Sequence, residues 1–414
     1  MPGIVFLHPD LGIGGAERLV IDAALALKDK GHVVSFVTTH HDPSHCFKET
    51  SDGTFSVKVV GDWMPRCFCG RFYALFAYLR MIYAAIYLIF FSGLSPDVVF
   101  CDLVSACIPI LRLNKKVRVL FYCHFPDQLL SKTEGRLKKI YRFPLNWLEE
   151  ITTGMAHKIL VNSSFTAGVF ERTFSRISKK IKPSILYPAV DVSKFNPSSN
   201  ELSKDVLTEI GIPENASLLV SINRYERKKN LLLALDALRA LKEIIKDENW
   251  SSVHLVMAGG YDVRVGENVE YYQELVDHSK SVDVFEKATF LKSPSDAVKV
   301  ALLQSACCLL YTPSNEHFGI VPIEAMSAGC PVVAVCSGGP LETVVNEKTG
   351  YLCEPSAGSF ASAVAKLVSS KELVAKMGAN GQEHVKSLFS NRAFADSLEK
   401  IVEELLSSSN PKKM

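Results

Sequence analysis

Two glutamates are placed for chemistry: Glu316 and Glu324 flank a segment that reads His-Phe-Gly-Ile-Val-Pro-Ile. The apolar run 306–312 before them predicts a buried strand, and Pro322 suits the first position of a helix, so Glu316 is expected on a loop and Glu324 in a first helical turn. Carboxylates accept hydrogen bonds from hydroxyl groups, and a helix N-terminus attracts phosphate. Glutamates at this spacing are common by chance, but the strand, loop and helix around them indicate a receptor for a sugar nucleotide.

Basic residues follow the predicted strand 218–221, in the segment Asn-Arg-Tyr-Glu-Arg-Lys-Lys-Asn. Parallel α/β sheets bind ligands at the carboxyl ends of their strands. A guanidinium from Arg224 and an ammonium from Lys229 would there clamp a diphosphate and neutralise a leaving nucleotide. A solvated charge run is the alternative interpretation. Arg227 or Lys228 would replace Lys229 in the clamp if the turn is tighter.

Glycines follow the first predicted strand as well, in the turn that contains Gly14 and Gly15. Such a turn brings backbone N–H groups close to a ligand at a helix start, although a plain strand-to-helix turn has the same pattern. Glu17 stands where the dinucleotide-binding fingerprint needs a third small residue, so a nicotinamide enzyme is disfavoured. Glycine-rich segments also follow predicted strands at 258–260 and 337–342, and both are expected on the same edge of the second sheet.

His124 follows the apolar run 117–122, so it is expected to point into a crevice between two domains. A single histidine is more often structural, and a role in the site is the alternative. Downstream, the segment 136–147 interleaves basic residues with Leu, Ile, Tyr, Phe and Trp. That pattern suits an anionic membrane surface, and it suits equally a helix that covers the sheet.

Apolar runs alternate with helix-period segments along the chain, which predicts a doubly wound parallel sheet twice over. A length of 414 residues also exceeds what one core usually fills. A polar, turn-rich linker is expected at about 190–205. The predicted domains are 1–200 and 201–390, followed by an amphipathic helix and tail at 391–414 that could pack on either domain. The predicted strands are 4–8, 33–38, 97–101, 117–122, 158–161, 218–221, 253–258, 288–291, 306–311 and 332–335.

One segment, 72–94, is far more apolar than a surface helix, and Arg80 is the charged residue within it. A membrane span needs about 20 apolar residues, which this stretch barely reaches and only by burying Arg80. Three interpretations stay open: a helix that lies in the plane of a membrane, a core helix of the first domain, and a span.

Composition excludes several other classes. The net charge is +2, which provides no general field to attract nucleic acid. Eleven cysteines at irregular spacings, without paired zinc-ligand spacing, indicate reduced thiols. No basic and then apolar leader precedes the first predicted strand, so a cleaved signal peptide is not expected.

Together the motifs resemble glycosyltransferase family 4 with the GT-B fold, over nearly the whole chain. They are closest to the eukaryotic α-1,3/1,6-mannosyltransferases of dolichol-linked oligosaccharide assembly. The resemblance implies an α/β GT-B fold, in which two Rossmann-like, doubly wound parallel-sheet domains face each other across a cleft. The strings that carry the resemblance are His8-Pro-Asp-Leu-Gly-Ile-Gly-Gly-Ala-Glu-Arg18, Phe121-Tyr-Cys-His-Phe-Pro-Asp127, Ser221-Ile-Asn-Arg-Tyr-Glu-Arg-Lys-Lys-Asn230 and Tyr311-Thr-Pro-Ser-Asn-Glu-His-Phe-Gly-Ile-Val-Pro-Ile-Glu324.

The same resemblance implies the substrates and the location. GDP-mannose would be the donor and a dolichyl-diphosphate chitobiose with one mannose the acceptor, to which one α-1,3 and one α-1,6 mannose are added. The reaction would take place on the cytosolic face of the endoplasmic reticulum membrane. The implied partners are these two substrates, membrane lipid and other glycosyltransferases of the dolichol pathway, without nucleic acid.

Residue roles follow by the same resemblance. Glu316 would hold the donor mannose, helped by the backbone N–H groups of Phe318, Gly319 and Ile320. Glu324 would accept a hydrogen bond from the nucleotide ribose.

The remaining roles concern the phosphates and the transferred sugar. Arg224 and Lys229 would neutralise the departing GDP, Gly14 and Gly15 would face the donor phosphate or the acceptor, and His124 would line the sugar site near the transferred carbon. The chain contains no Asp-x-Asp, so these cations would replace a divalent metal and no cofactor is expected.

The family reaction retains configuration, and no residue stands out as a nucleophile for double displacement, which favours front-face transfer. Three alternatives remain: a family 4 transferase with another lipid-linked substrate, a GT-B epimerase, and an inactive GT-B scaffold. The charged residues of the motifs speak against the scaffold.

Overall fold

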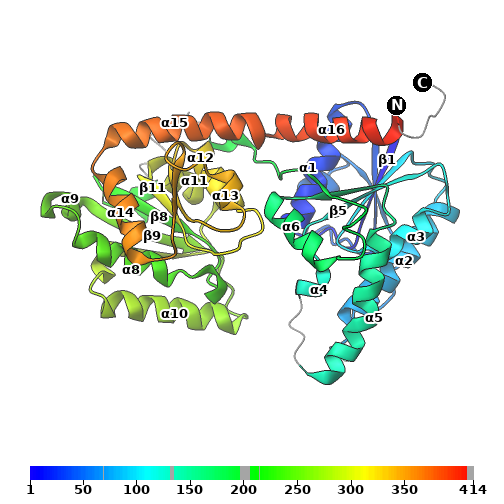
Figure 1. Ribbon diagram of the computed structural model, residues 1–414, viewed down its shortest axis with the longest axis horizontal. Coiled ribbons are helices and arrows are strands. Elements are labelled where there is room, and N and C mark those ends of the chain that lie inside the picture. The colour runs from blue at the N-terminus through cyan, green and yellow to red at the C-terminus, as the bar shows by residue number, and fades with distance from the viewer. Residues whose placement is uncertain (69, 131–134, 196–205, 214, 408–414) are drawn as a thin grey trace. The chain divides into compact units, whose positions relative to one another are not determined.

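A computed structural model describes residues 1–68, 70–130, 135–195, 206–213 and 215–407. It divides into two compact units, one made of 1–189 with 391–414 and the other of 190–390 (Figure 1). The domain border predicted at 200 lies outside the described residues, and the chain changes unit between Ala189 and Val190. The C-terminal helix, whose partner the sequence left open, belongs to unit 1.

Unit 1 is built on a seven-stranded parallel sheet in the order β3-β2-β1-β4-β5-β6-β7. Alternate side chains of the inner strands enter different cores, so Val5 and Leu7 contact one cluster while Ile4 and Phe6 contact the other. Burial on both faces explains why these strands read as continuous apolar runs. The strands are β1 (Gly3–His8), β2 (Val33–Thr38), β3 (Ser56–Val59), β4 (Val98–Asp102), β5 (Arg118–Cys123), β6 (Lys158–Val161) and β7 (Ser184–Ile185).

Helices cover both faces of this sheet. The first core cluster joins it to α2 (Tyr73–Phe90), α3 (Ile108–Leu111), α5 (Arg136–Thr153) and α6 (Ser164–Thr173), and the second to α1 (Gly15–Asp29) and α16 (Asn391–Ser407). A further short helix, α4 (Asp127–Leu130), follows β5. The doubly wound arrangement predicted for the first half is confirmed.

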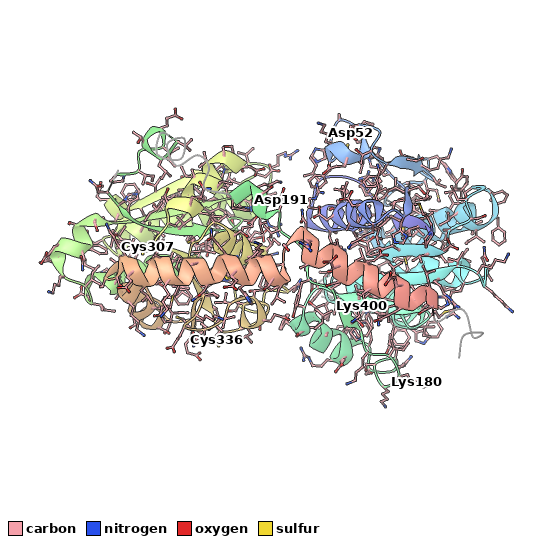
Figure 2. All side chains as sticks on the ribbon, turned by 90° about the horizontal axis from the view of Figure 1, so that it is seen from above. Asp52, Lys180, Asp191, Cys307, Cys336 and Lys400 are labelled. Atoms are coloured by element: carbon pink, nitrogen blue, oxygen red, sulfur yellow. The ribbon has the colours of Figure 1, made fainter. Side chains whose placement is uncertain are left out.

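The C-terminal helix α16 lies along α1 (Figure 1). Lys30 and Asp396 form an ion pair at 2.5 Å, and His32 contacts Glu399 at 2.7 Å. Figure 2 shows α16 from its outer side, where Lys400 is exposed. The buried face of α16 that completes the core of unit 1 consists of Phe394, Leu398, Val402 and Leu405.

Unit 2 has a six-stranded parallel sheet in the order β10-β9-β8-β11-β12-β13. Its strands are β8 (Ser217–Ile222), β9 (Val253–Gly259), β10 (Ala288–Lys292), β11 (Cys308–Tyr311), β12 (Val332–Val335) and β13 (Gly350–Cys353). Its helices are α8 (Leu232–Lys242), α9 (Asp247–Ser252), α10 (Gly266–Ser281), α11 (Asp296–Ser305), α12 (Ile320–Ser327), α13 (Pro340–Thr343), α14 (Ala357–Val368) and α15 (Lys371–Leu388). The second Rossmann-like sheet is thereby confirmed.

The apolar segment 72–94 forms α2, which is long and apolar enough to cross a membrane by length and composition alone. One face, which includes Met81, Ala84 and Leu88, packs in the core of unit 1. Arg80 is buried there, and its guanidinium donates to the Thr39 carbonyl at 2.6 Å. The core-helix interpretation therefore holds for this face, and only the opposite face is open to another surface.

The ten cysteines among the described residues are free thiols, as the irregular spacing predicted. Most are buried in the two cores, while Cys336 is exposed at the end of β12 (Figure 2). Cys69 lies outside the described residues.

Candidate active site

Both sheets have a switch point at the same place in their strand order. Connections from neighbouring strands leave in opposite directions between β1 and β4 in unit 1, and between β8 and β11 in unit 2. Ligands of open α/β sheets bind at the carboxyl ends of the strands at such points. The loops after these four strands carry most of the residues that the sequence singled out.

Lys229 and Glu316 form an ion pair at the switch point of unit 2. The Lys229 ammonium donates a hydrogen bond to Oε2 of Glu316, and only 12% and 23% of the two side chains are exposed. Lys229 ends a 3-10 turn, and the hydroxyl of Thr312 donates to its carbonyl at 2.8 Å. Because Thr312 directly follows β11, the loop that carries Glu316 also positions Lys229.

Glu316 is ionised at neutral pH. Burial raises the pKa of Glu316, but the Lys229 ammonium outweighs burial and the pKa lies below its usual value. Tyr311 is buried beside the pair, and burial together with the Glu316 carboxylate raises its pKa, so its phenol stays a neutral donor. An ammonium has three N–H donors, so Lys229 can hold Glu316 and a second anion together.

Glycines let the neighbouring loops approach this site. The Gly339 N–H donates to the Glu316 carbonyl at 2.7 Å. A Cβ on Gly339 would lie 2.1 Å from the Phe318 carbonyl oxygen, and one on Gly338, where φ is +68°, would lie 2.5 Å from the Glu316 carbonyl oxygen. The segment 337–342 therefore packs its backbone directly on the Glu316 loop. A side chain at Gly338 or Gly339 would prevent this packing.

Helix α12 begins at Ile320, two residues before the predicted start. Gly319 caps it with φ at +86°, and Pro322 is its third residue, where a missing N–H removes no helical hydrogen bond. The N-terminus has no side-chain cap, so its first N–H groups are suited to hydroxyl or phosphate oxygens. Phe318 is buried and lies just before this turn.

Glu324 consequently lies in the second turn of α12, and its placement in the first turn was wrong. Its Oε1 accepts a hydrogen bond from the Lys299 ammonium at 2.6 Å, while its Oε2 is buried without a hydrogen-bond partner among the described residues. A buried carboxylate oxygen without a donor is unfavourable. Of the two carboxylate oxygens, Oε2 is therefore the one that can still accept a hydrogen bond.

The other basic residues of the 224–229 loop point elsewhere. Arg227 contacts Glu274 at 3.0 Å, and Lys228 contacts Glu226 at 3.0 Å. Of the three neighbouring residues 227–229, Lys229 is the one that contacts Glu316. Arg224 is 64% exposed and contacts Glu226 at 3.0 Å, so it is not in contact with the Lys229–Glu316 pair.

Close packing fixes the start of the same loop. A Cβ on Gly259 would lie 1.7 Å from the Asn223 carbonyl oxygen. The Tyr225 N–H donates to the Gly260 carbonyl at 3.1 Å, and the buried Tyr225 hydroxyl donates to the Met257 carbonyl at 2.9 Å. Arg224 therefore has a fixed backbone just after β8, and its long side chain passes next to Gly260.

In unit 1, Gly14 and Gly15 lie at the start of α1. The backbone of Gly14 is extended, with φ at −169°, so it needs no left-handed conformation. A Cβ on Gly14 would instead meet the Glu17 carboxylate at 2.3 Å, while one on Gly15 would meet nothing within 4 Å. Gly14 therefore makes room for Glu17, the residue that departs from the dinucleotide fingerprint.

His124 belongs to a polar cluster at the switch point of unit 1. Its Nε2 lies 3.0 Å from Oδ2 of Asp102, and Oδ1 of Asp102 lies 2.7 Å from Nδ1 of His8. The other nitrogen of His8 is 3.8 Å from Glu17. His8 and Asp102 are fully buried, while 19% of the His124 side chain is exposed.

Replacing His8 by glutamine should flatten the pH dependence of stability. Burial lowers the pKa of His8, but Asp102 and Glu17 outweigh burial and raise it to about 10. An unfolded histidine titrates near ~6.5, so between these values the native state binds the extra proton and stability falls as the pH rises, by at most about 1.4 kcal/mol per unit.

Urea unfolding of both proteins between pH ~6.5 and ~8 measures this slope, below the pH at which unfolded thiols ionise. The wild type should lose stability across that window, and His8→Gln should lose less. Equal slopes would contradict a charged His8.

Three residues of these sites escaped the sequence analysis. Lys299 lies on α11 and Asp102 at the end of β4, and neither belongs to a motif with a known spacing. His8 ends a predicted strand and opens the first motif string, but no role is predicted for it. A charged residue that closes an apolar run, as Asp102 does, is the one signal that was available. Among the described residues, no group of three or more His, Cys, Asp or Glu side chains is arranged to hold a metal ion.

Comparison with known proteins places these units in families. Residues 13–194 match the family model for glycosyltransferase family 4, and residues 204–384 match the model for glycosyl transferases group 1. The chain is 51% identical to the α-1,3/1,6-mannosyltransferase ALG2 of Homo sapiens, over 98% of this chain and 96% of that protein. It is 40% identical to ALG2 of Saccharomyces cerevisiae, over 97% and 85% of the two chains.

Solved structures agree on the fold. A sucrose-phosphate synthase of Thermosynechococcus elongatus superposes with a TM-score of 0.75 at 19% identity, covering 99% of this chain and 100% of that one. WaaG, a glycosyltransferase involved in lipopolysaccharide biosynthesis, superposes with a TM-score of 0.67 at 16% identity, covering 96% and 99%. At these identities the likeness concerns the GT-B fold alone.

Proposed function

Because the chain belongs to the ALG2 family of α-1,3/1,6-mannosyltransferases, we propose that it moves mannose from GDP-mannose to a dolichyl-diphosphate chitobiose that already carries one mannose. It adds one mannose in α-1,3 and one in α-1,6 linkage. The observation that supports the donor site is the Lys229–Glu316 pair beside the uncapped N-terminus of α12. Glu316 offers an acceptor for sugar hydroxyls, and Lys229, which is hydrogen-bonded to it, offers a cation for phosphate.

In this proposal Glu316 binds mannose hydroxyls together with the N–H groups of Phe318, Gly319 and Ile320. Glu324 accepts a ribose hydroxyl through Oε2, the oxygen that Lys299 leaves open. Gly14 and Gly15 face the donor phosphate or the acceptor.

Transfer proceeds on one face of the mannose. The bond between C1 and the phosphate oxygen breaks, a bond from C1 to the acceptor oxygen forms on the same face, and the acceptor proton passes to the departing phosphate. Lys229 and Arg224 stabilise the negative charge on GDP, Arg224 by swinging its exposed side chain from Glu226. His124 lines the sugar near C1. These cations do the work of a divalent metal, so transfer proceeds without one.

The test is to incubate the protein in lipid with GDP-mannose and the lipid-linked acceptor, with EDTA present, and to read products by mass. An increment of two mannoses supports donor, acceptor and metal independence together. Transfer only after a divalent cation is restored would refute the metal-free mechanism, and transfer from another nucleotide sugar would favour a different family 4 reaction. Turnover of GDP-mannose without acceptor would favour an epimerase.

We also propose that unit 1 docks on the cytosolic face of the endoplasmic reticulum membrane, where the lipid-linked acceptor resides. The open face of α2 is apolar, and α5 exposes apolar side chains beside Arg136, Lys138 and Lys139. The two helices adjoin, since the Phe72 and Tyr141 rings are 5.1 Å apart. Arg142 is buried against Asp127 and is not part of this surface. The exposed apolar residues are Tyr73, Leu75, Leu79, Tyr83, Phe90, Leu137, Ile140, Phe143, Trp147 and Ile151.

The double variant Phe90→Glu, Phe143→Glu should bind less to vesicles of phosphatidylcholine and phosphatidylinositol. A charge on an apolar face opposes insertion of that face into the membrane interface. Co-sedimentation measures binding. Leu113→Glu is the control, since Leu113 is 61% exposed on unit 1 outside these helices. Unchanged sedimentation of the double variant would contradict the docking surface.

A further inference from the structure

A carboxylate with no exposed surface joins two imidazoles at the switch point of unit 1. Asp102 is the last residue of β4, between His8 at the end of β1 and His124 just after β5. Each carboxylate oxygen meets one ring, at 2.7 Å for His8 and 3.0 Å for His124. Strands β1, β4 and β5 are adjacent in the sheet, so the contacts tie three strand ends together.

The charge of Asp102 decides which nitrogen of His124 carries the proton. Burial raises the pKa of Asp102, but the charge of His8 and the hydrogen bonds of both histidines outweigh burial and lower it, so Asp102 is ionised. An ionised carboxylate only accepts hydrogen bonds. His124 must therefore donate from Nε2, and in the neutral ring its Nδ1 is left with a lone pair.

We propose that Asp102 is a positioning residue for glycosyl transfer, which holds the ring of His124 and fixes its proton on Nε2, so that Nδ1 accepts a hydrogen bond from a hydroxyl of a sugar substrate. This inference rests on the proposed function for the identity of the sugar. Its structural part, the tautomer of His124, stands on unit 1 alone. The ring has solvent access for such a contact, since 19% of the side chain is exposed.

His8 completes the arrangement as a buried counter-ion. Its ring lies between Asp102 and Glu17, at 2.7 and 3.8 Å. A protonated His8 offsets the charge of these carboxylates, so that Asp102 can stay ionised without solvent. Neither His8 nor Asp102 is accessible to a substrate, and both act through His124.

The variant that tests the role is Asp102→Asn. Its amide oxygen would face the His8 cation and its NH₂ group would face His124, which turns Nε2 into an acceptor and moves the proton to Nδ1. Mannosyl transfer should then fall about 10–100-fold in kcat, the range found when the carboxylate partner that orients a metal-binding histidine is lost. The KM for GDP-mannose should change less than about twofold, because the change affects one hydroxyl contact and not the nucleotide.

Comparison with His124→Ala separates positioning from simple stability. If Asp102 acts through His124, the double variant should be no slower than His124→Ala alone. Ser105→Ala is the matched control, because Ser105 is buried three residues after Asp102 and its hydroxyl contacts Thr152 at 2.8 Å. It should lower stability and leave kcat unchanged. Equal rate losses from Asp102→Asn with and without His124 would overturn the proposal.

Nitrogen NMR of histidine-labelled protein reads the tautomer without any activity. The His124 signals are identified by their loss in His124→Ala. The proton should be on Nε2 in the wild type and on Nδ1 in Asp102→Asn. A wild-type His124 with its proton on Nδ1 would overturn the inference, even if Asp102→Asn does not fold. A correct tautomer in a protein that transfers no mannose would instead refute the proposed function.

Discussion

Replacing Glu316 by glutamine should lower the rate of mannosyl transfer about 10²–10³-fold, the range seen when one fixed electrostatic contact to a reacting group is removed. Glutamine keeps the shape of the side chain and loses its charge. Lys229 would then lack its anionic partner in a site where only 12% of its own side chain is exposed. The single substitution would therefore weaken the binding of the sugar and also leave the Lys229 ammonium less well positioned.

The rate is measured as initial incorporation of mannose into the lipid-linked acceptor, with donor affinity from calorimetry. Glu274→Gln is the control, because Glu274 pairs with Arg227 of the same loop at 3.0 Å but is 42% exposed. Exposed pairs contribute at most about 1 kcal/mol, so this variant should keep nearly full activity. A fully active Glu316→Gln, or equal losses in the two variants, would remove Glu316 from the site.

Lys229→Met should cost a similar factor of about 10²–10³, for two reasons. The leaving diphosphate loses a cation, and Glu316 loses the charge that lowers its pKa. Only the smaller effects of His317 and Lys228 would then oppose burial, so the pKa of Glu316 would rise. Because the carboxylate is needed ionised, the residual activity of Lys229→Met should increase with pH over a range in which the wild type is constant.

A pH–rate profile of both proteins checks this sign. Lys228→Met is the neighbouring control, since Lys228 is 67% exposed and contacts Glu226. Lys229→Arg should recover part of the rate, because the charge returns with a different donor geometry. An unshifted profile in Lys229→Met would show that Lys229 does not control the ionisation of Glu316.

Nine of the ten predicted strands lie within one residue of their observed ends, and β11 begins two residues later than predicted. The three strands that were missed, β3, β7 and β13, each lie at an edge of a sheet. An edge strand is covered on fewer sides and needs no continuous apolar run, and β7 has only two residues. Apolar periodicity therefore detects the interior of a sheet better than its rim.

The helix after Glu316 shows a second limit of local signals. Proline is tolerated throughout the first turn of a helix, so Pro322 predicted that a helix begins nearby but not at which residue. The start is set by Gly319 and by the packing of Gly338 on Glu316 and of Gly339 on Phe318, contacts between residues that are distant in the sequence. This error of two residues moved Glu324 from the first turn of the helix into the second.

What the sequence by itself determined is the chemistry available at each strand end: which loops carry carboxylates, cations and glycines, and that two parallel sheets present them. These features depend on residue type and on periodicity along the chain. Only the tertiary structure decided which charges meet. Lys229 rather than Lys228 reaches Glu316, Lys299 reaches Glu324, and Asp102 joins His8 to His124. Each of these contacts joins different loops or helices, and the order and register of the strands, which bring them together, are set by packing of the whole sheet.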